Sequence, residues 1–203
     1  MARTSQQDLK RWTDIIGSII LLWLFLPLGM LIAILIKIDD GGPVFYRRKV
    51  MGKGGSQFDA FKFRTMVVNA EEILLRNPQL REEFEKNYKL QSDPRITRVG
   101  QVLRKTSLDE FPQLFNVLLG QMSLIGPRMI SPPELSKYGD EAEKLLSARP
   151  GCSGPWVVSG RQNIPYDQRV KIELDYVNNW SLGLDIRLIA KTVVAMLSMR
   201  GAL

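Results

Sequence analysis

An uncharged, mostly apolar segment from Ile15 to Ile36 constrains this chain more than any other feature of its sequence. As a straight helix it would rise about 33 Å, enough to cross a hydrocarbon core of about 30 Å. Pro27 lies in its middle, where a proline removes one backbone hydrogen bond and kinks a helix. The segment therefore predicts a membrane helix that is bent or broken at its centre.

Basic residues stand on both sides of this segment. They are Arg3, Lys10 and Arg11 before it, and Lys37, Arg47, Arg48, Lys49 and Lys53 after it. Flanks rich in lysine and arginine favour the cytoplasm, and a single crossing cannot place both flanks there. We therefore predict a re-entrant helix–break–helix in residues 1–39 and a cytosolic domain in residues 40–203. The alternative is a kinked helix that spans the bilayer.

The amino-acid composition limits the kinds of partner the chain can bind and the side chains it can use in catalysis. A net charge of +7 and a pI of about 9.6 favour an anionic partner, such as nucleic acid, an acidic membrane surface or a phosphorylated substrate. The chain has no histidine, which excludes Ser-His and Cys-His nucleophile pairs and histidine-bound zinc. Its one cysteine, Cys152, allows no internal disulfide and lies in a turn-rich stretch, where we interpret it as a small filler residue. Carboxylates, lysine and tyrosine remain for catalysis, with Mg²⁺ or Mn²⁺ as the metals they suit.

Two adjacent carboxylates, Asp109 and Glu110, follow two cations, Arg104 and Lys105. Apolar residues at helical spacing come next, and they are Phe111, Leu114, Phe115, Leu118 and Leu119. Ser107 and Glu110 have the spacing of a capping box, which predicts a helix that begins between Ser107 and Asp109. Pro112 would then lie in the first turn.

That position places Asp109 at the positive end of a helix and beside two cations, so we expect it to be ionised at neutral pH. An ionised, fixed carboxylate serves as a nucleophile or as a ligand for a hard metal ion. The alternative is an ordinary helix cap with surface charges.

The rest of the chain predicts an α+β domain that is mostly helical. Strands are expected at 43–50 and 57–66, joined as a hairpin by Gly52-Lys53-Gly54-Gly55. Helices are expected at 67–90, with a break near Pro78, and at 96–105.

Four further cations are candidates for holding phosphate. Lys62 and Arg64 share one face of the second strand, and Arg128 and Arg161 stand in glycine-containing turns. The alternative for each is a solvated surface charge.

An amphipathic helix is expected from Leu182 onward. Its apolar face carries Ile186, Ile189, Val193, Met196 and Leu197. Such a face either packs on the core or lies in a membrane interface, and the basic residues Arg187 and Lys191 favour the interface.

Taken together, these segments resemble the bacterial sugar transferase family of small monotopic phosphoglycosyl transferases. The resemblance runs from the apolar segment to about Leu188 and rests on six ordered motifs. They are Gly42-Pro43-Val44-Phe45-Tyr46, Lys62-Phe63-Arg64-Thr65-Met66, Asp93 to Gly100, Leu103 to Asn116, Met122 to Arg128, and Asn179-Trp180-Ser181-Leu182 with Leu184-Asp185. Glu173 stands where members of the family often have aspartate, which keeps the charge.

The resemblance implies transfer of a sugar 1-phosphate from a UDP-sugar to polyprenol phosphate, with release of UMP. Asp109 would attack the sugar-bearing phosphate to form a covalent intermediate, and Glu110 would act as general base or orient the acceptor. Mg²⁺ would bind with Asp109 as a ligand. Arg104, Arg128, Lys62, Arg64 and Arg161 would hold phosphates.

The resemblance also implies a setting. The lipid bilayer would be a partner and nucleic acid would not. The protein would lie on the cytoplasmic face of the inner membrane and take part in exopolysaccharide or glycoconjugate assembly. A homodimer is one option for the oligomeric state. Two rival hypotheses stay open, a non-catalytic basic monotopic protein that binds anionic lipid and an inactive member of the family.

Overall fold

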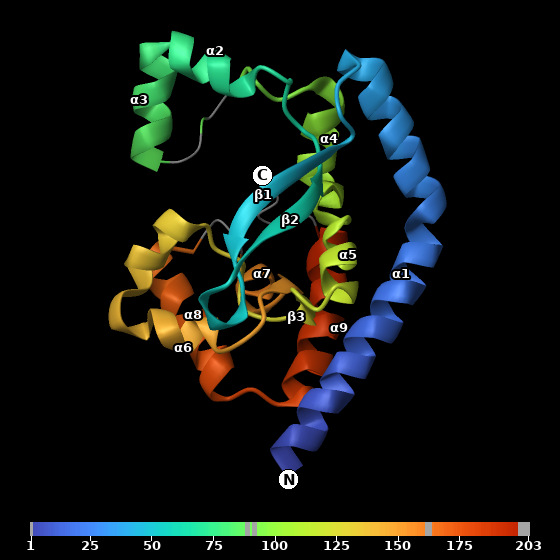
Figure 1. Ribbon diagram of the computed structural model, residues 1–203, viewed down its shortest axis with the longest axis vertical. Coiled ribbons are helices and arrows are strands. Elements are labelled where there is room, and N and C mark those ends of the chain that lie inside the picture. Colours follow the sequence, from blue (N-terminus) through green and yellow to red (C-terminus); the bar gives the residue numbers. More distant parts are fainter. Residues whose placement is uncertain (1, 88–89, 91–92, 161–163, 199–203) are drawn as a thin grey trace.

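The computed structural model describes residues 2–87, 90, 93–160 and 164–198. The described part is mostly helical and contains two small sheets, so the predicted fold class is confirmed. One long helix, α1 (Ala2–Asp40), runs along one side of the molecule and bows around the remaining elements (Figure 1).

Helix α1 is continuous through Pro27, so the helix–break–helix predicted for this segment is a bent helix here. By length and hydropathy α1 could cross a membrane, and little of its most apolar stretch is buried. Large apolar side chains such as Trp23, which is 78% exposed, cover its outer surface. Its inner surface packs on the domain, where Ile32 and Ile36 join Phe63 and Leu103 in one buried cluster.

The predicted hairpin is confirmed. Strands β1 (Phe45–Met51) and β2 (Gln57–Phe63) pair antiparallel, with Phe45 opposite Phe63, and η1 (Lys53–Gly55) forms the turn. Val50, Phe58 and Ala60 bury one part of the hairpin against the core.

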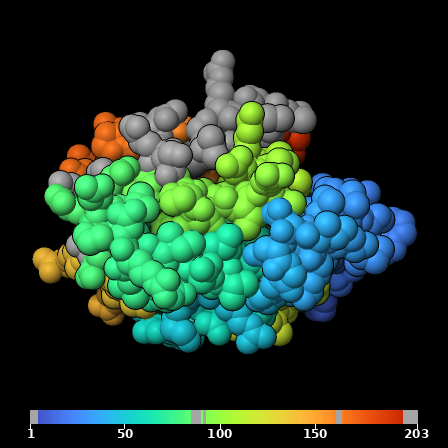
Figure 2. Space-filling model, turned by 90° about the horizontal axis from the view of Figure 1, so that it is seen from above, coloured from blue at the N-terminus to red at the C-terminus, as the bar shows by residue number. Residues whose placement is uncertain are grey.

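The predicted break near Pro78 is confirmed too, since α2 (Ala70–Arg76) ends before it and α3 (Pro78–Asn87) begins with it. Helix α4 (Arg98–Thr106) fits so closely against the segment after β2 that a Cβ atom on Gly100 would lie 2.1 Å from the Thr65 carbonyl oxygen. In Figure 2, α4 lies beside that segment and near the C-terminal half of α1.

The helix predicted to begin between Ser107 and Asp109 starts later, and its predicted capping box is wrong. A 3₁₀ turn, η2 (Leu108–Glu110), comes first, and α5 (Gln113–Leu118) follows. Pro112 has no N–H and crowds the carbonyl four residues before it, so this stretch uses tighter i to i+3 hydrogen bonds. Ser107 adopts a left-handed conformation (φ 59°), and its side chain makes no capping hydrogen bond.

The other elements build the domain's second half, around a short parallel sheet. They are β3 (Ser123–Ile125), η3 (Pro132–Glu141), α6 (Ala142–Leu146), β4 (Gly151–Ser153), α7 (Pro155–Val158), α8 (Tyr166–Asn178) and α9 (Leu182–Ser198). Helix α8 packs against α6 and α7, away from α1, whereas α9 lies nearer α1 (Figure 1).

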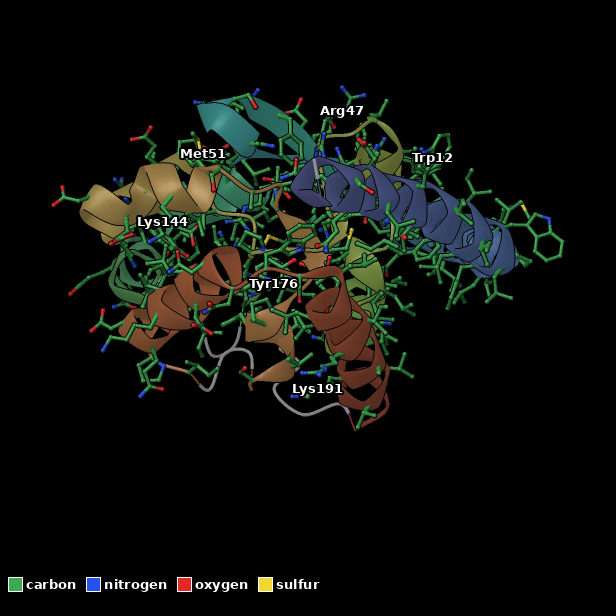
Figure 3. The ribbon with its side chains drawn as sticks, turned by 90° about the horizontal axis from the view of Figure 1, so that it is seen from below. Trp12, Arg47, Met51, Lys144, Tyr176 and Lys191 are labelled. Carbon is green, nitrogen blue, oxygen red and sulfur yellow. The ribbon has the colours of Figure 1, made fainter. Side chains whose placement is uncertain are left out.

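The last helix packs on the core with one part of its apolar face and leaves another part exposed. Leu188 on α9 is buried in the core with Tyr176, which lies near the centre of Figure 3. Ile186 and Val193 are exposed, as the interface interpretation expects. Met196 and Leu197 were also predicted on this apolar face, and their side chains lie outside the part of the chain that the structure describes.

Polar side chains tie the first turns of α1 to the domain. Lys10 Nζ lies 2.5 Å from Asp185 Oδ2, and Tyr176 Oη donates to the other oxygen of Asp185 over 2.6 Å. Arg11 donates to two carbonyl oxygens at the end of α5, and Asp14 accepts from the Ser123 hydroxyl. At the opposite end of α1, Asp40 forms an ion pair with Arg64, so both ends of the helix are fixed to the same domain.

Candidate active site

The turn that carries Asp109 and Glu110 lies between α1 and the hairpin. On one side, the Phe111 ring lies 5.1 Å from the Phe25 ring of α1, centroid to centroid. On the other side, η2 packs against β2. The left-handed backbone of Ser107 ends α4 and redirects the chain, which sets both carboxylates against the hairpin.

Lys62 on β2 contacts both carboxylates. Its Nζ lies 2.6 Å from Glu110 Oε1 and 3.8 Å from Asp109 Oδ2. Lys62 and Asp109 are 15% and 13% exposed, so their interaction is only weakly screened by solvent. The sequence predicted Lys62 separately from the two carboxylates, and the fold brings it to them.

The two carboxylates differ in acidity because their surroundings differ. Burial raises the pKa of Asp109 to about 6, and the charge of Glu110 adds to that rise, while Lys62 and Arg104 oppose it. Glu110 is held ionised by Lys62 and by the charge of Arg128, and its pKa falls to about 2 despite burial. Asp109 is therefore more basic than an ordinary aspartate, yet it is mostly ionised at neutral pH, as predicted. Of the predicted causes, the α-helix end is absent, whereas the charge of Arg104 does lower the pKa of Asp109.

Two of the predicted arginines flank this pair. Arg104 on α4 hydrogen-bonds the Thr65 hydroxyl through Nε at 3.0 Å, and its charge lowers the pKa of Asp109. Arg128 follows β3 and interacts with the charge of Glu110. Its guanidinium carbon lies 4.1 Å from the centroid of the Trp156 ring, the geometry of a cation–π contact.

Close backbone packing fixes the turn that presents Arg128. A Cβ atom on Gly126 would lie 2.4 Å from the Arg149 carbonyl oxygen, and one on Gly151 would lie 2.1 Å from Gly126 N. Cys152 lies beside this turn, and burial raises the pKa of its thiol far above the usual range. A thiol that stays protonated agrees with its interpretation as a filler residue.

The other two predicted cations lie elsewhere. Arg64 turns away from Lys62 and binds Asp40, with further hydrogen bonds to the carbonyl oxygens of Pro43 and Met66. Its donors are engaged in holding the end of α1. Arg161 lies outside the described residues.

Four charged residues around Arg128 were not predicted as site residues. Arg48 lies 3.2 Å from Glu134, and Arg169 lies 3.8 Å from the same carboxyl group. Burial raises the pKa of Glu173 to about 7, and one of its oxygens accepts a hydrogen bond from the Arg128 N–H. These residues come from β1, η3 and α8, so only the folded chain brings them together, and local sequence spacing carried no signal for the set.

The acidic residues here fit magnesium only with help from a substrate. Within the described residues, no group of three or more acidic or cysteine side chains gathers in a way that would hold a metal ion. Mg²⁺ is commonly held by one or two carboxylates together with substrate phosphates and water. Asp109, with Glu110 beside it, fits that kind of site.

Comparison with known proteins identifies a family for this chain. The sequence profile of the bacterial sugar transferases matches residues 5–199. The chain belongs to this family. Within it, the chain is 46% identical over 207 residues to the undecaprenyl-phosphate galactose phosphotransferase of Salmonella typhimurium, covering all of this chain and 43% of that protein. It is 44% identical over 197 residues to the exopolysaccharide production protein ExoY of Rhizobium meliloti, covering 95% of this chain and 87% of ExoY.

A third relative is named for another sugar. The chain is 40% identical to a UDP-N-acetylgalactosamine-undecaprenyl-phosphate N-acetylgalactosaminephosphotransferase of Aeromonas hydrophila, over 96% of this chain and 45% of that protein. The chain spans less than half the length of several of these transferases. Relatives of similar identity thus carry names with different sugars.

Proposed function

We propose that this chain is a phosphoglycosyl transferase that moves a sugar 1-phosphate from a UDP-sugar to polyprenol phosphate. The observation that carries the proposal is Asp109, a buried carboxylate of raised pKa held between Lys62 and Arg104. Relatives named for undecaprenyl phosphate and for UDP-sugars support the substrate classes. The exopolysaccharide name of the Rhizobium relative supports a role in polysaccharide assembly.

The reaction would proceed in two displacements at one phosphorus atom. An Asp109 oxygen attacks the β-phosphorus of the UDP-sugar, the bond from that phosphorus to the bridging oxygen breaks, and UMP leaves. An oxygen of the polyprenol phosphate then attacks the same phosphorus, which releases the Asp109 carboxylate and gives a polyprenyl diphosphate sugar. Phosphoryl transfer depends mainly on positioning and charge stabilisation, and Lys62, Arg104 and Arg128 supply cations for both.

The structure favours one of the two roles expected for Glu110. A carboxyl group with a pKa of about 2 is a weak base at neutral pH. The same ionised group holds Lys62 at 2.6 Å, next to Asp109. Glu110 therefore acts in this proposal by orienting Lys62 and the acceptor phosphate, and not by removing a proton.

Magnesium belongs to this proposal as a substrate-bridging ion. Asp109 would contribute a ligand, with donor phosphates and water supplying the others. Bound there, the ion would neutralise charge on the diphosphate of the donor.

We further propose that the protein is monotopic and lies on the cytoplasmic face of the cell membrane. Lys10 and Asp40, near opposite ends of α1, both bind residues of the same domain. A helix that crossed the bilayer would place its ends on opposite sides, which these contacts oppose. Cysteines at Thr4 and Gly54 test this, since labelling of the two from opposite sides by an impermeant reagent would refute a monotopic arrangement.

The reaction is tested by measuring UMP release over a panel of UDP-sugars, with undecaprenyl phosphate and Mg²⁺ present. We expect release with one or a few sugars, and a loss of at least about 10³-fold in Asp109→Asn, which removes the nucleophile but keeps the volume. Asp140→Asn is the matched control, because Asp140 is an exposed aspartate on η3.

Two outcomes would overturn the proposal. Unchanged turnover in Asp109→Asn would refute the covalent route. No UMP from any UDP-sugar would favour the rival hypothesis of a basic membrane protein that only binds anionic lipid. Donor labelled in its sugar should leave label on the wild-type protein when no acceptor is present, and none on Asp109→Asn.

A further inference from the structure

A second group of polar side chains lies next to Arg128, and the transfer steps above do not use it. Within the part of the chain that the structure describes, three of its atoms are buried without a hydrogen-bond partner, namely Nε and Nη2 of Arg169 and Oε1 of Glu173. Buried polar groups in folded proteins are nearly always paired. A cluster of unpaired donors and acceptors points to a ligand that pairs them.

The geometry of α8 explains why these groups do not satisfy one another. Arg169 and Glu173 are four residues apart, the usual spacing of an ion pair on a helix. Among the described residues they form no such pair, because Arg169 turns toward Glu134 and Glu173 turns toward the Arg128 N–H. Each side chain keeps unpaired polar atoms.

Aromatic rings border the same place. The guanidinium of Arg169 lies 5.5 Å from the Trp156 centroid and 4.9 Å from the Tyr166 centroid. The guanidinium of Arg128 lies closer to Trp156, at 4.1 Å from its ring centroid. A small cleft is lined here by Arg128, Trp156, Val157 and Glu173.

The charges favour an anion with a polar, ring-containing body. Arg48, Arg128 and Arg169 face three carboxyl groups, those of Glu110, Glu134 and Glu173. Burial raises the pKa of Glu173 to about 7, so cations exceed carboxylates when Glu173 is protonated. Arginine suits phosphate, and aromatic side chains offer faces for a base to stack on. A nucleoside monophosphate combines these features.

Two phosphate esters share this chemistry, the nucleotide and the polyprenol phosphate, and the position of the cluster selects between them. Helix α8 packs against α6 and α7, whereas the apolar surface of α1 lies on the other side of the active-site turn (Figure 1). A lipid acceptor would arrive from α1, where Phe25 contacts Phe111. The α8 side is left for the water-soluble donor.

We propose that Arg169, Glu173 and Trp156 form the subsite that holds the nucleoside monophosphate half of the donor, the part that leaves as UMP. Arg169 donates hydrogen bonds to its phosphate, Glu173 binds the ribose hydroxyls, and Trp156 packs against the base. This inference rests on the proposed function for the identity of the donor. It adds a subsite on the side of Glu110 that faces away from α1.

The test is UMP binding to the full chain in lipid nanodiscs, measured by isothermal titration without acceptor or UDP-sugar. We expect Arg169→Gln to weaken UMP binding at least about tenfold, as loss of charge-assisted hydrogen bonds does. Lys171→Gln is the matched control, because it removes a cation from the exposed face of the same helix and should leave the affinity unchanged. Arg169→Lys should recover part of the affinity.

A parallel titration with a short-chain polyprenol phosphate separates the two phosphate sources. Arg169→Gln should leave that affinity within about twofold of wild type. Wild-type UMP affinity in Arg169→Gln would overturn the subsite, as would a loss in Lys171→Gln of the same size or a loss of lipid binding in place of UMP binding. Thermal unfolding of each variant checks its folding, and Trp156→Phe gives a second test if Arg169→Gln fails to fold.

The two proposals fail in different ways. UMP binding that depends on Arg169, with no turnover of any UDP-sugar, would keep the subsite and reject the transfer reaction. Turnover that needs Asp109, with UMP affinity unaffected by Arg169→Gln, would keep the reaction and reject the subsite.

Discussion

The polar side chains that dock α1 and those on the inner face of α8 are similarly buried but differ in how they are paired. Beside α1, Asp185 accepts hydrogen bonds from Lys10, Tyr176 and Trp180, and Asp14 accepts two more. On α8, Arg169 and Glu173 each keep buried polar atoms that have no partner among the described residues. A satisfied network holds structure together, whereas an unsatisfied one of this size is suited to binding something else.

Two residues on the α1 side depart from this contrast. The Ser18 hydroxyl and the side-chain amide of Gln113 are fully buried, and no residue that the structure describes hydrogen-bonds them. Gln113 begins α5, three residues after Glu110, so its unpaired amide lies close along the chain to the active-site turn. Among the described residues, unpaired groups thus occur on α8, with a second set on α1 and α5.

The largest expected effect is on stability, and it tests the paired side chains that dock α1. Asp185→Asn leaves Lys10 without its carboxylate partner and should lower the free energy of unfolding by about 3–5 kcal/mol. Thermal unfolding and limited proteolysis of the detergent-solubilised protein measure this loss. Asp8→Asn, at an exposed aspartate on the same helix as Lys10, should change little. Equal stability of the two variants would contradict a structural role for the network.

A smaller effect tests the α8 side through its response to pH. The pKa of Glu173 is raised in the folded protein to about 7 from 4.5, so the folded state holds this proton more tightly than the unfolded state does. Stability is then greatest below about pH 4.5 and falls as the pH rises toward 7, by at most roughly 3 kcal/mol. Glu173→Gln should abolish that part of the pH dependence, measured as unfolding at pH 5 and pH 8.

The contrast between the two regions would be refuted if Glu173→Gln and the wild type lost the same free energy of unfolding between pH 5 and pH 8. That result would mean that Glu173 is ionised in the folded protein and paired, like the carboxylates that dock α1.

The third effect concerns the carboxylates that lie between the two regions. The charge of Glu110 raises the pKa of Asp109, and Lys62 lowers it. With Asp109 as nucleophile, kcat/KM should fall as the pH drops through about 6. Glu110→Gln should move this fall in kcat/KM to lower pH, and Lys62→Met should move it to higher pH, each by up to about one pH unit. Shifts in the same direction for both variants would contradict this electrostatic arrangement.

The smallest effect tests the outer surface on the α1 side. Ile186→Ser or Val193→Ser removes an exposed apolar side chain from α9 and should weaken membrane association by roughly 1 kcal/mol each, with no loss of folding stability. Flotation with liposomes measures the association. Leu75→Ser on α2, also exposed but far from α9 in Figure 1, is the control.

Local patterns predicted the elements of this fold better than they predicted the site. The hairpin and the break at Pro78 followed from glycine, proline and alternating apolar residues, which act over a few residues. The start of α5 was wrong because the Ser107–Glu110 spacing suggested a cap, while the missing N–H of Pro112 decided the backbone.

Some features of the site could likewise be predicted from local sequence, and others depend on the fold. Asp109 and Glu110 are neighbours in sequence and were predicted together, but their unequal pKa values depend on Lys62 from another strand. The partner of Arg64 is Asp40, from the end of α1, and nothing local in the strand indicated it. The group around Arg169 gathers from three elements, so its unpaired atoms become visible only in the folded structure.

The contact between Lys10 and Asp185 joins residues 175 positions apart. During synthesis, α1 leaves the ribosome long before α9 exists, so Lys10 gains its carboxylate partner only at the end of translation. The positive charge beside the apolar segment of the new chain is therefore neutralised last, when the domain that it holds to α1 is complete.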